Sequence, residues 1–185
     1  MTTTKQSWLK RSLAVLLAVM MVMSMGVANV FAAGTDEVNI PDSNLKAAIN
    51  RQLAKQTGSQ RADDAAVTED DMASLTELVA EDAGITDLTG LDKAVNLETL
   101  DLSGNELSMS SPFETLAFIT GLTSLDLSNN HFTGKLLCAL EMNSLEILDL
   151  SGNRINAIEL GNVTFPNIEK IDLSDNYFYQ DESTV

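Results

Sequence analysis

Apolar residues recur in a fixed order from Leu75 onward. Segments that begin at 97, 122, 145 and 168 follow L-x-x-L-x-L-x-x-N-x-L, with Ile or Phe replacing some Leu, and a looser copy begins at 75. The five starts are 22, 25, 23 and 23 residues apart. The central x-L-x-L stretch alternates as a half-buried strand does. One such turn cannot bury its own apolar side chains, so the turns must stack.

This pattern at this period is identified as the leucine-rich repeat. It implies an α/β fold: a right-handed leucine-rich repeat solenoid with one parallel concave β-sheet and a small N-terminal helical cap. We place the solenoid at 75–185, with five units of which the last is incomplete. The first unit has Ala80 and Ala83 where the others have Leu and Asn, which suits a terminal turn that contacts a cap.

An asparagine marks the point where each turn leaves the sheet. An amide there can both donate to and accept from backbone groups of adjacent turns. We therefore expect a structural ladder made by Asn105, Asn130, Asn153 and Asn176. The segments that return to the next strand show few helical patterns, so we expect short or irregular turns, with a helix best supported at 110–119.

Residues 33–74 are predicted to form the helical cap. Leu45, Ala48, Ile49 and Leu53 recur at helical spacing. Asp42 or Ser43 can cap the start of this helix, and Gly58 follows its end. Farther on, a second short helix is indicated by the capping-box pair Thr68 and Asp71.

Residues 1–32 have the pattern of a secretory signal peptide. Lys5, Lys10 and Arg11 precede an apolar stretch from Leu13 to Met23, and small residues surround Ala32. A retained membrane anchor is the alternative, but the strongly apolar stretch is shorter than the ~20 residues that a spanning helix needs. We expect a secreted, extracellular protein, with association with the cell surface as an alternative. After cleavage of the signal peptide we expect no membrane contact.

Charge and composition narrow the function classes. The chain has 11 Lys and Arg against 27 Asp and Glu, a net charge of −16. Nucleic acid and anionic membranes are poor partners for such a surface, because binding to either is built from Lys and Arg. The single Cys excludes an internal disulfide and a multi-cysteine zinc site.

The acidic residues concentrate on the predicted concave face, which comprises positions 2, 3, 5, 7 and 8 of each unit. Eleven of these twenty-five residues are acidic and one, Lys170, is basic. One acid per turn falls in a single column, at ~4.7–4.9 Å spacing. The candidate binding residues are Glu98, Asp101, Asp126, Glu146, Asp149, Glu169 and Asp172, with Arg154 and Tyr177 at the rim.

The repulsion between like charges in one column must be offset by a favourable interaction. Hydrogen bonds between turns from the column Ser103, Ser128, Ser151 and Ser174 are the structural explanation. A basic partner is the functional one. Calcium is a further alternative, since it prefers clustered carboxylates, with Asp101, Asp126, Asp149 and Asp172 as weak candidates. No other cofactor is indicated.

Catalysis finds little support in the sequence. His131 and Cys138 could suggest a thiol nucleophile with its base. In the repeat frame, however, His131 falls at the rim and Cys138 on the convex return, so the two should not meet. We therefore expect a noncatalytic module that binds a protein or glycan ligand, with a calcium-stabilised structural or cell-envelope protein as the alternative.

The N-terminal segments IPDSNLKAAI and VTEDDMASL, followed by the repeats, are similar to secreted bacterial leucine-rich repeat proteins of the internalin type. This resemblance implies noncatalytic binding of proteins or glycans. LDLSNNHFTGKL also resembles the repeats of plant receptors.

The last repeat has little sequence after it to cover its core. The strand near 168–173 would expose edge groups and the core-side residues Ile171, Leu173 and Phe178. We expect weak self-association through this edge.

Overall fold

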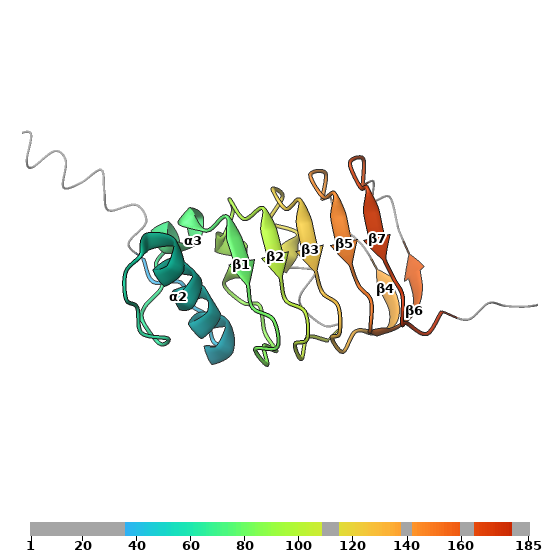
Figure 1. Cartoon of the computed structure of the whole chain (residues 1–185), viewed down its shortest axis with the longest axis horizontal. Helices are drawn as coiled ribbons and strands as arrows, with labels where there is room; N and C mark the ends of the chain where they lie inside the picture. Colours follow the sequence, from blue (N-terminus) through green and yellow to red (C-terminus); the bar gives the residue numbers. More distant parts are fainter. Residues whose placement is uncertain (1–35, 109–114, 138–141, 160–164, 179–185) are drawn as a thin grey trace, which may run out of the picture. The chain divides into compact units, whose positions relative to one another are not determined.

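The computed structural model describes residues 36–108, 115–137, 142–159 and 165–178. The chain divides into a unit of residues 1–36 and a unit of residues 37–185, and the second holds all the elements considered below. These are α2 (Ser43–Thr57), α3 (Glu69–Ser74), β1 (Glu77–Val79), the 3-10 helix η1 (Leu91–Lys93), β2 (Thr99–Asp101), β3 (Ser124–Asp126), β4 (Thr133–Leu137), β5 (Ile147–Asp149), β6 (Arg154–Glu159) and β7 (Lys170–Asp172) (Figure 1). Within the described ranges, no helix has the length and apolar character needed to cross a membrane.

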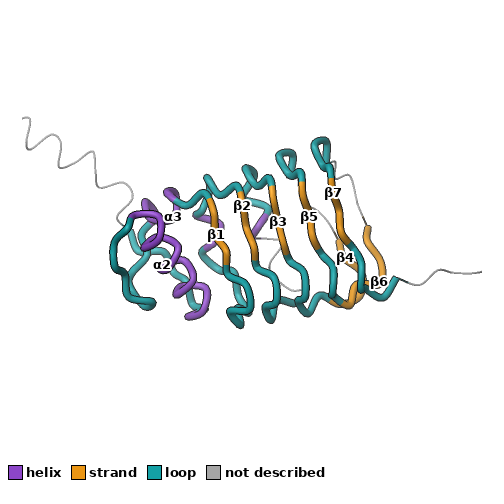
Figure 2. The backbone as a smooth tube through the Cα atoms, viewed as in Figure 1, coloured by secondary structure: helices purple, strands orange, loops and turns teal. Residues whose placement is uncertain are grey.

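The main sheet has the strand order β1-β2-β3-β5-β7, and every pair is parallel. Each strand comes from one repeat, so the strands follow one another along the unit (Figures 1 and 2). The register aligns the fourth residue of each unit in one row: Leu78, Leu100, Leu125, Leu148 and Ile171. The predicted fold, a right-handed leucine-rich repeat solenoid with a parallel concave sheet and a helical cap, is confirmed.

The core lies between the sheet and the returning segments. Phe132 and nearly all the repeat leucines are fully buried, as are Leu88, Leu91 and Leu116 on the returns. Burying such a side chain contributes about 1.5–3 kcal/mol relative to leaving it exposed. Since each row of apolar side chains runs through neighbouring turns, this stabilisation belongs to pairs of turns and not to single repeats.

Two return segments form a second parallel sheet. β4 pairs with β6, with a register shift at Gly134 and Lys135. The expectation of irregular turns is wrong here, because two successive returns are both extended and can satisfy each other's backbone groups. Figure 2 shows this pair of strands apart from the main sheet. Half of the helix expected at 110–119 lies outside the described residues; of the other half, Thr115 and Leu116 are helical and 117–119 are not.

The cap follows its sequence signals closely. Asp42 is the N-cap of α2, and its Oδ1 accepts hydrogen bonds from the backbone N–H of Asn44 and Leu45. Gly58 ends the helix in the left-handed conformation, with φ of 66°. The predicted capping box of Thr68 and Asp71 is present at the start of α3.

Asp42 also joins the cap to the first repeat. Its Oδ2 accepts hydrogen bonds from the N–H and Oγ1 of Thr86 and from the N–H of Asp87, at 2.8–3.1 Å. Partial burial raises the pKa of Asp42, but the donors from Thr86, Leu45 and Asp87 outweigh it, so the pKa lies below its ordinary value. One carboxylate therefore caps a helix and positions it against the solenoid.

Candidate functional site

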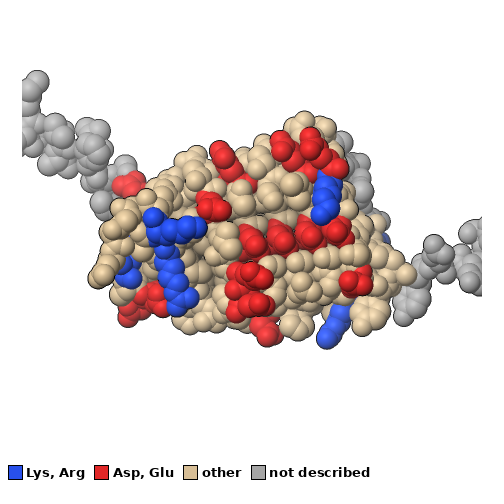
Figure 3. Space-filling view, viewed as in Figure 1, with Lys and Arg blue, Asp and Glu red and all other residues tan. Residues whose placement is uncertain are grey.

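The acidic column is formed as a row across the sheet. The register places Asp101 beside Asp126, Asp126 beside Asp149 and Asp149 beside Asp172. Parallel strands lie ~4.7–4.9 Å apart, so the carboxylates repeat at that interval. Figure 3 shows a continuous red band across this face, with blue side chains gathered at the end that carries α2 and a few near the opposite end.

Each of these aspartates binds the serine two residues later in its own turn. Oδ1 of Asp149 accepts from the N–H of Ser151 at 2.9 Å and from its Oγ at 2.6 Å. Asp101 and Asp172 make the same two bonds, and Asp126 makes the backbone bond. The expectation that Asp and Ser bond between turns is therefore wrong, because an aspartate readily satisfies the backbone two residues on. Ser128 is moreover buried.

This arrangement uses only one oxygen of each carboxylate. Within the described residues, Oδ2 of Asp101, Asp126 and Asp149 has no hydrogen-bond donor. At the end of the row, Oδ2 of Asp172 lies 3.9 Å from Nζ of Lys170. Donation from the side chain and N–H of Ser174, aided by Lys170, lowers the pKa of Asp172 although slight desolvation raises it. The row therefore presents fixed carboxylates, three of which have a second oxygen without a hydrogen-bond donor among the described residues.

The concave face also carries further acids and two aliphatic side chains. Glu98, Glu146 and Glu169 are exposed at the start of their strands, where their backbone carbonyl or N–H links one turn to the next. Val79 is 46% exposed and Ile147 is 42% exposed. Ile147 precedes Asp149 by two residues on the same strand, so one exposed apolar side chain adjoins the acidic row.

The rim residues stand apart from that row. Arg154 and Tyr177 are exposed, and their N–H groups donate to the carbonyls of Phe132 and Ile155 in the preceding turns. His131 occupies the same column, with Nδ1 3.6 Å from Oε2 of Glu106. The structure thus places Arg154 and Tyr177 on neighbouring turns, beyond the asparagines and not among the aspartates.

The asparagines connect consecutive turns. Nδ2 of Asn130 donates to the carbonyls of Leu102 in the preceding turn and Leu127 in its own, and its Oδ1 accepts from the N–H of Leu107. Asn105, Asn153 and Asn176 make equivalent bonds. Their amides are occupied by backbone groups, so they are not available to a ligand.

A feature that the sequence pattern did not reveal lies at the eighth position of each unit, one residue before the asparagine or, in the first unit, before Ala83. Every turn has a positive φ there, at Asp82, Gly104, Asn129, Gly152 and Asp175. A Cβ placed on Gly104 would overlap Oδ1 of Asp82, and one on Gly152 would overlap Oδ1 of Asn129. Side chains and glycines therefore alternate from turn to turn. The recurring S-G-N and S-N-N spellings were the available signal.

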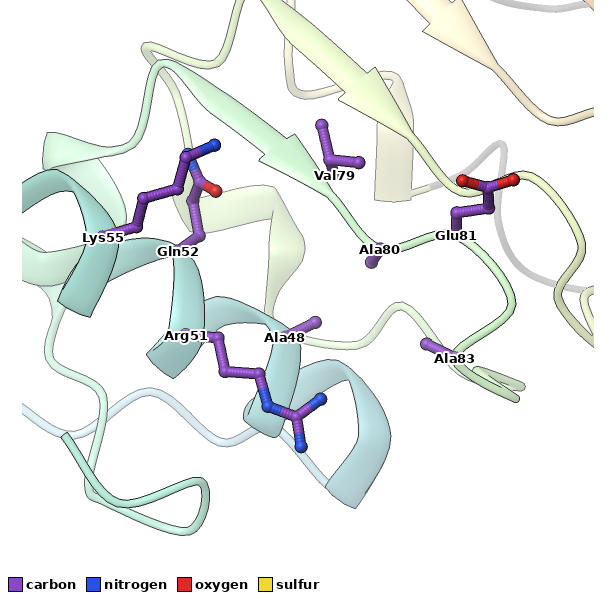
Figure 4. A pocket seen from close by; sticks show the side chains of 8 residues that line it. All are labelled: Ala48, Arg51, Gln52, Lys55, Val79, Ala80, Glu81 and Ala83. Atoms are coloured by element: carbon purple, nitrogen blue, oxygen red, sulfur yellow. The ribbon is translucent and has the colours of Figure 1, made fainter.

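A hollow of about 400 Å³ lies where the cap meets the first repeat. Arg51, Gln52 and Lys55 of α2 form one side, and Val79, Ala80 and Glu81 lie opposite (Figure 4). The small Ala80 and Ala83 stand where other turns have Leu and Asn, which leaves this space. Arg51 pairs with Asp63, and Nζ of Lys55 lies 4.0 Å from Oε2 of Glu77.

The described residues show no arrangement that favours metal binding or thiol chemistry. Among the residues that the structure describes, no group of three or more His, Cys, Asp and Glu side chains is placed to hold a metal ion. Cys138, the other half of the considered thiol pair, lies outside the described residues.

Comparison with known proteins places this geometry in a family. Residues 40–176 match the family model described as the leucine-rich repeat domain of the endo-beta-N-acetylglucosaminidase EndoS. BRASSINOSTEROID INSENSITIVE 1 of Arabidopsis thaliana is 42% identical over 74 residues, which are 37% of this chain and 6% of that protein.

Two solved internalins of Listeria monocytogenes share the fold. InlF is 20% identical with a TM-score of 0.56, covering 77% of this chain and 46% of that one. InlJ is 22% identical with a TM-score of 0.56, covering 76% of this chain and 30% of that one. The chain thus spans less than half the length of each of these three proteins. The predicted resemblance is confirmed, and the chain belongs to the family of leucine-rich repeat domains represented by that of EndoS.

Proposed function

We propose that this chain is a secreted, noncatalytic leucine-rich repeat module that binds a basic segment of a partner protein on its acidic concave face. The observation that carries the proposal is the row of Asp101, Asp126, Asp149 and Asp172, held by backbone register with the Oδ2 of its first three members free of donors within the described residues. Fixed carboxylates cost little to organise when a cation arrives.

The surroundings of the row favour lysine or arginine side chains over small cations. Ile147 lies beside the row and is 42% exposed. The long stems of Lys and Arg pack on apolar surface while their charged ends reach carboxylates. A glycan ligand would have to supply cationic groups of its own to use the same row.

The location in this proposal rests on the sequence of residues 1–32. Their basic start and apolar centre support export, with 33–74 as the cap and 75–185 as the solenoid. An exported module with an acidic face meets basic partners outside the cell or at its surface.

A direct test measures binding of a fluorescent octalysine peptide to the full chain at low and moderate salt. We expect saturable binding that weakens steeply with salt, because the contacts are charge pairs near solvent. The variant Asp126→Asn with Asp149→Asn keeps the Oδ1 acceptors and removes two charges, and it should weaken binding roughly tenfold.

The matched control removes the same charge elsewhere. Asp64→Asn with Glu69→Gln alters two exposed cap residues whose side chains make no hydrogen bond or ion pair within the described chain, and it should leave octalysine binding unchanged. Equal binding by both double variants would reject the concave row as the site. Stronger binding of a glucosamine oligomer than of octalysine would assign the face to a basic glycan instead.

A further inference from the structure

The core-side residues of the last described turn are more exposed than those of the turns before it. Ile171 continues the row of Leu78, Leu100, Leu125 and Leu148, which are at most 7% exposed, yet Ile171 is 45% exposed. Phe178 of the same turn is 42% exposed, although Leu107, Phe132 and Ile155 at the same position of earlier turns are fully buried. Within the described residues, β7 is the end strand of the sheet and has a neighbour on one side only, β5.

The backbone of β7 offers a hydrogen-bonding pair at this edge. The N–H of Lys170 donates to the carbonyl of Glu146, and the carbonyl of Asp172 accepts from the N–H of Leu150, so both residues bond toward the preceding turn. In a strand, the backbone groups of the residue between two such residues point to the opposite edge. The N–H and C=O of Ile171 therefore face outward.

The charges on β7 select one way of pairing. Lys170 is the single basic residue of the twenty-five concave positions, and Asp172 lies two residues later on the same face. If two copies of β7 run antiparallel about Ile171, Lys170 of each copy stands opposite the partner's Asp172. A parallel arrangement in register would place like charges together, which is destabilising.

We propose that two copies of this chain associate edge to edge, with β7 pairing antiparallel to β7 about a two-fold axis at Ile171. The two Ile171 residues exchange both backbone hydrogen bonds, as a hydrogen-bonded antiparallel pair does. Their side chains meet on the core side, and two Lys170–Asp172 pairs form on the concave side. The main sheets then join into one, with both acidic faces on the same side. Such an isologous contact closes on itself and forms a dimer.

A charge exchange tests both the association and its register. Sedimentation of the full chain over roughly micromolar to several hundred micromolar concentration should show a monomer–dimer equilibrium. Lys170→Asp and Asp172→Lys each place like charges opposite one another and should weaken the dimer at least about tenfold. The double variant restores opposite charges and should recover association to within about threefold.

Lys93→Asp is the matched control, because it makes the same charge change on an exposed lysine of η1. It should leave the dimer unchanged, and thermal unfolding of each variant checks that the fold persists. A native chain that stays monomeric throughout, association that survives Lys170→Asp, or a double variant that fails to recover would each overturn the proposal. No peptide is present in this measurement, so its outcome is independent of octalysine binding.

Discussion

At the residue scale, the left-handed position of each turn imposes the tightest steric requirement. Neighbouring turns bring these residues together, and the side chain of Asn129 occupies the space that a Cβ on Gly152 would need. Gly134 also has a positive φ, but no atom lies within 4 Å of a Cβ built there. Substitution of Gly134 therefore measures backbone strain alone, whereas substitution of Gly152 adds the overlap with Asn129 of the neighbouring turn.

Replacing Gly152 by Ala should lower the free energy of unfolding by more than the about 1–2 kcal/mol that left-handed strain alone costs. Gly134→Ala should cost only that strain. Asn129→Gly combined with Gly152→Ala should recover part of the loss, because the overlapping side chain is removed. Denaturant unfolding measures all three, and equal losses for the two single variants would show that the overlap is relieved by a small shift.

At the element scale, the cap is attached through charged hydrogen bonds at its first turn. Asp42 →Ala should lower the free energy of unfolding by about 2–3 kcal/mol, since it removes a helix N-cap and bonds from Thr86 and Asp87 to a carboxylate. Ser43→Ala changes the next residue, which is exposed, and should have a small effect. Urea unfolding at neutral pH compares the two variants.

The same carboxylate predicts a pH dependence. The pKa of Asp42 is lowered in the folded chain, so its contribution is complete above its ordinary value of 3.8 and is lost as the pH falls through the lower folded-state pKa. The difference in unfolding free energy between the natural chain and Asp42→Asn should therefore shrink from about pH 5 downward. A difference that stays constant over this range would contradict the ionised role of Asp42.

Local sequence patterns predict most of the helices and strands, but not the contacts between distant segments. The cap helices and the five strands follow from periodicity, capping residues and the repeat, because each signal lies within one turn. The pairing of β4 with β6 required two successive returns to be extended together, which neither TGKLL nor RINAIE shows alone. The second partner of Asp42, Thr86, is 44 residues away, so only the assembled structure brings them together.

The candidate surface was predictable to a similar extent. The repeat period alone places Asp101, Asp126, Asp149 and Asp172 in one row. The serine of the same turn binds one oxygen of each carboxylate and leaves the other without a bond from that serine. This depends on side-chain rotation that the spacing does not specify. The hollow beside Ala80 depends on how α2 lies against β1, and this is a tertiary contact.

At the scale of the whole molecule, the acidic row should oppose stability. Two carboxylates ~4–5 Å apart repel by about 1 kcal/mol in water. Asp126→Asn with Asp149→Asn keeps the bonds to serine and removes the repulsion of all three neighbouring pairs. The variant should therefore be more stable by about 1–3 kcal/mol at low salt, with the gain shrinking as salt screens the charges. Thermal unfolding at two salt concentrations measures it, and a loss of stability at low salt would contradict the argument.

The residues with positive φ alternate between glycines and larger residues, so the solenoid has a second period of two turns. Asp82, Gly104, Asn129, Gly152 and Asp175 repeat every two turns, although the leucines repeat every turn. Removing the second unit would set Asp82 directly beside Asn129, where the glycine now makes room. Removing the third unit would instead set Gly104 beside Gly152, where no side chain overlaps. The units are therefore not equivalent, and the unit that is removed decides whether neighbouring turns collide.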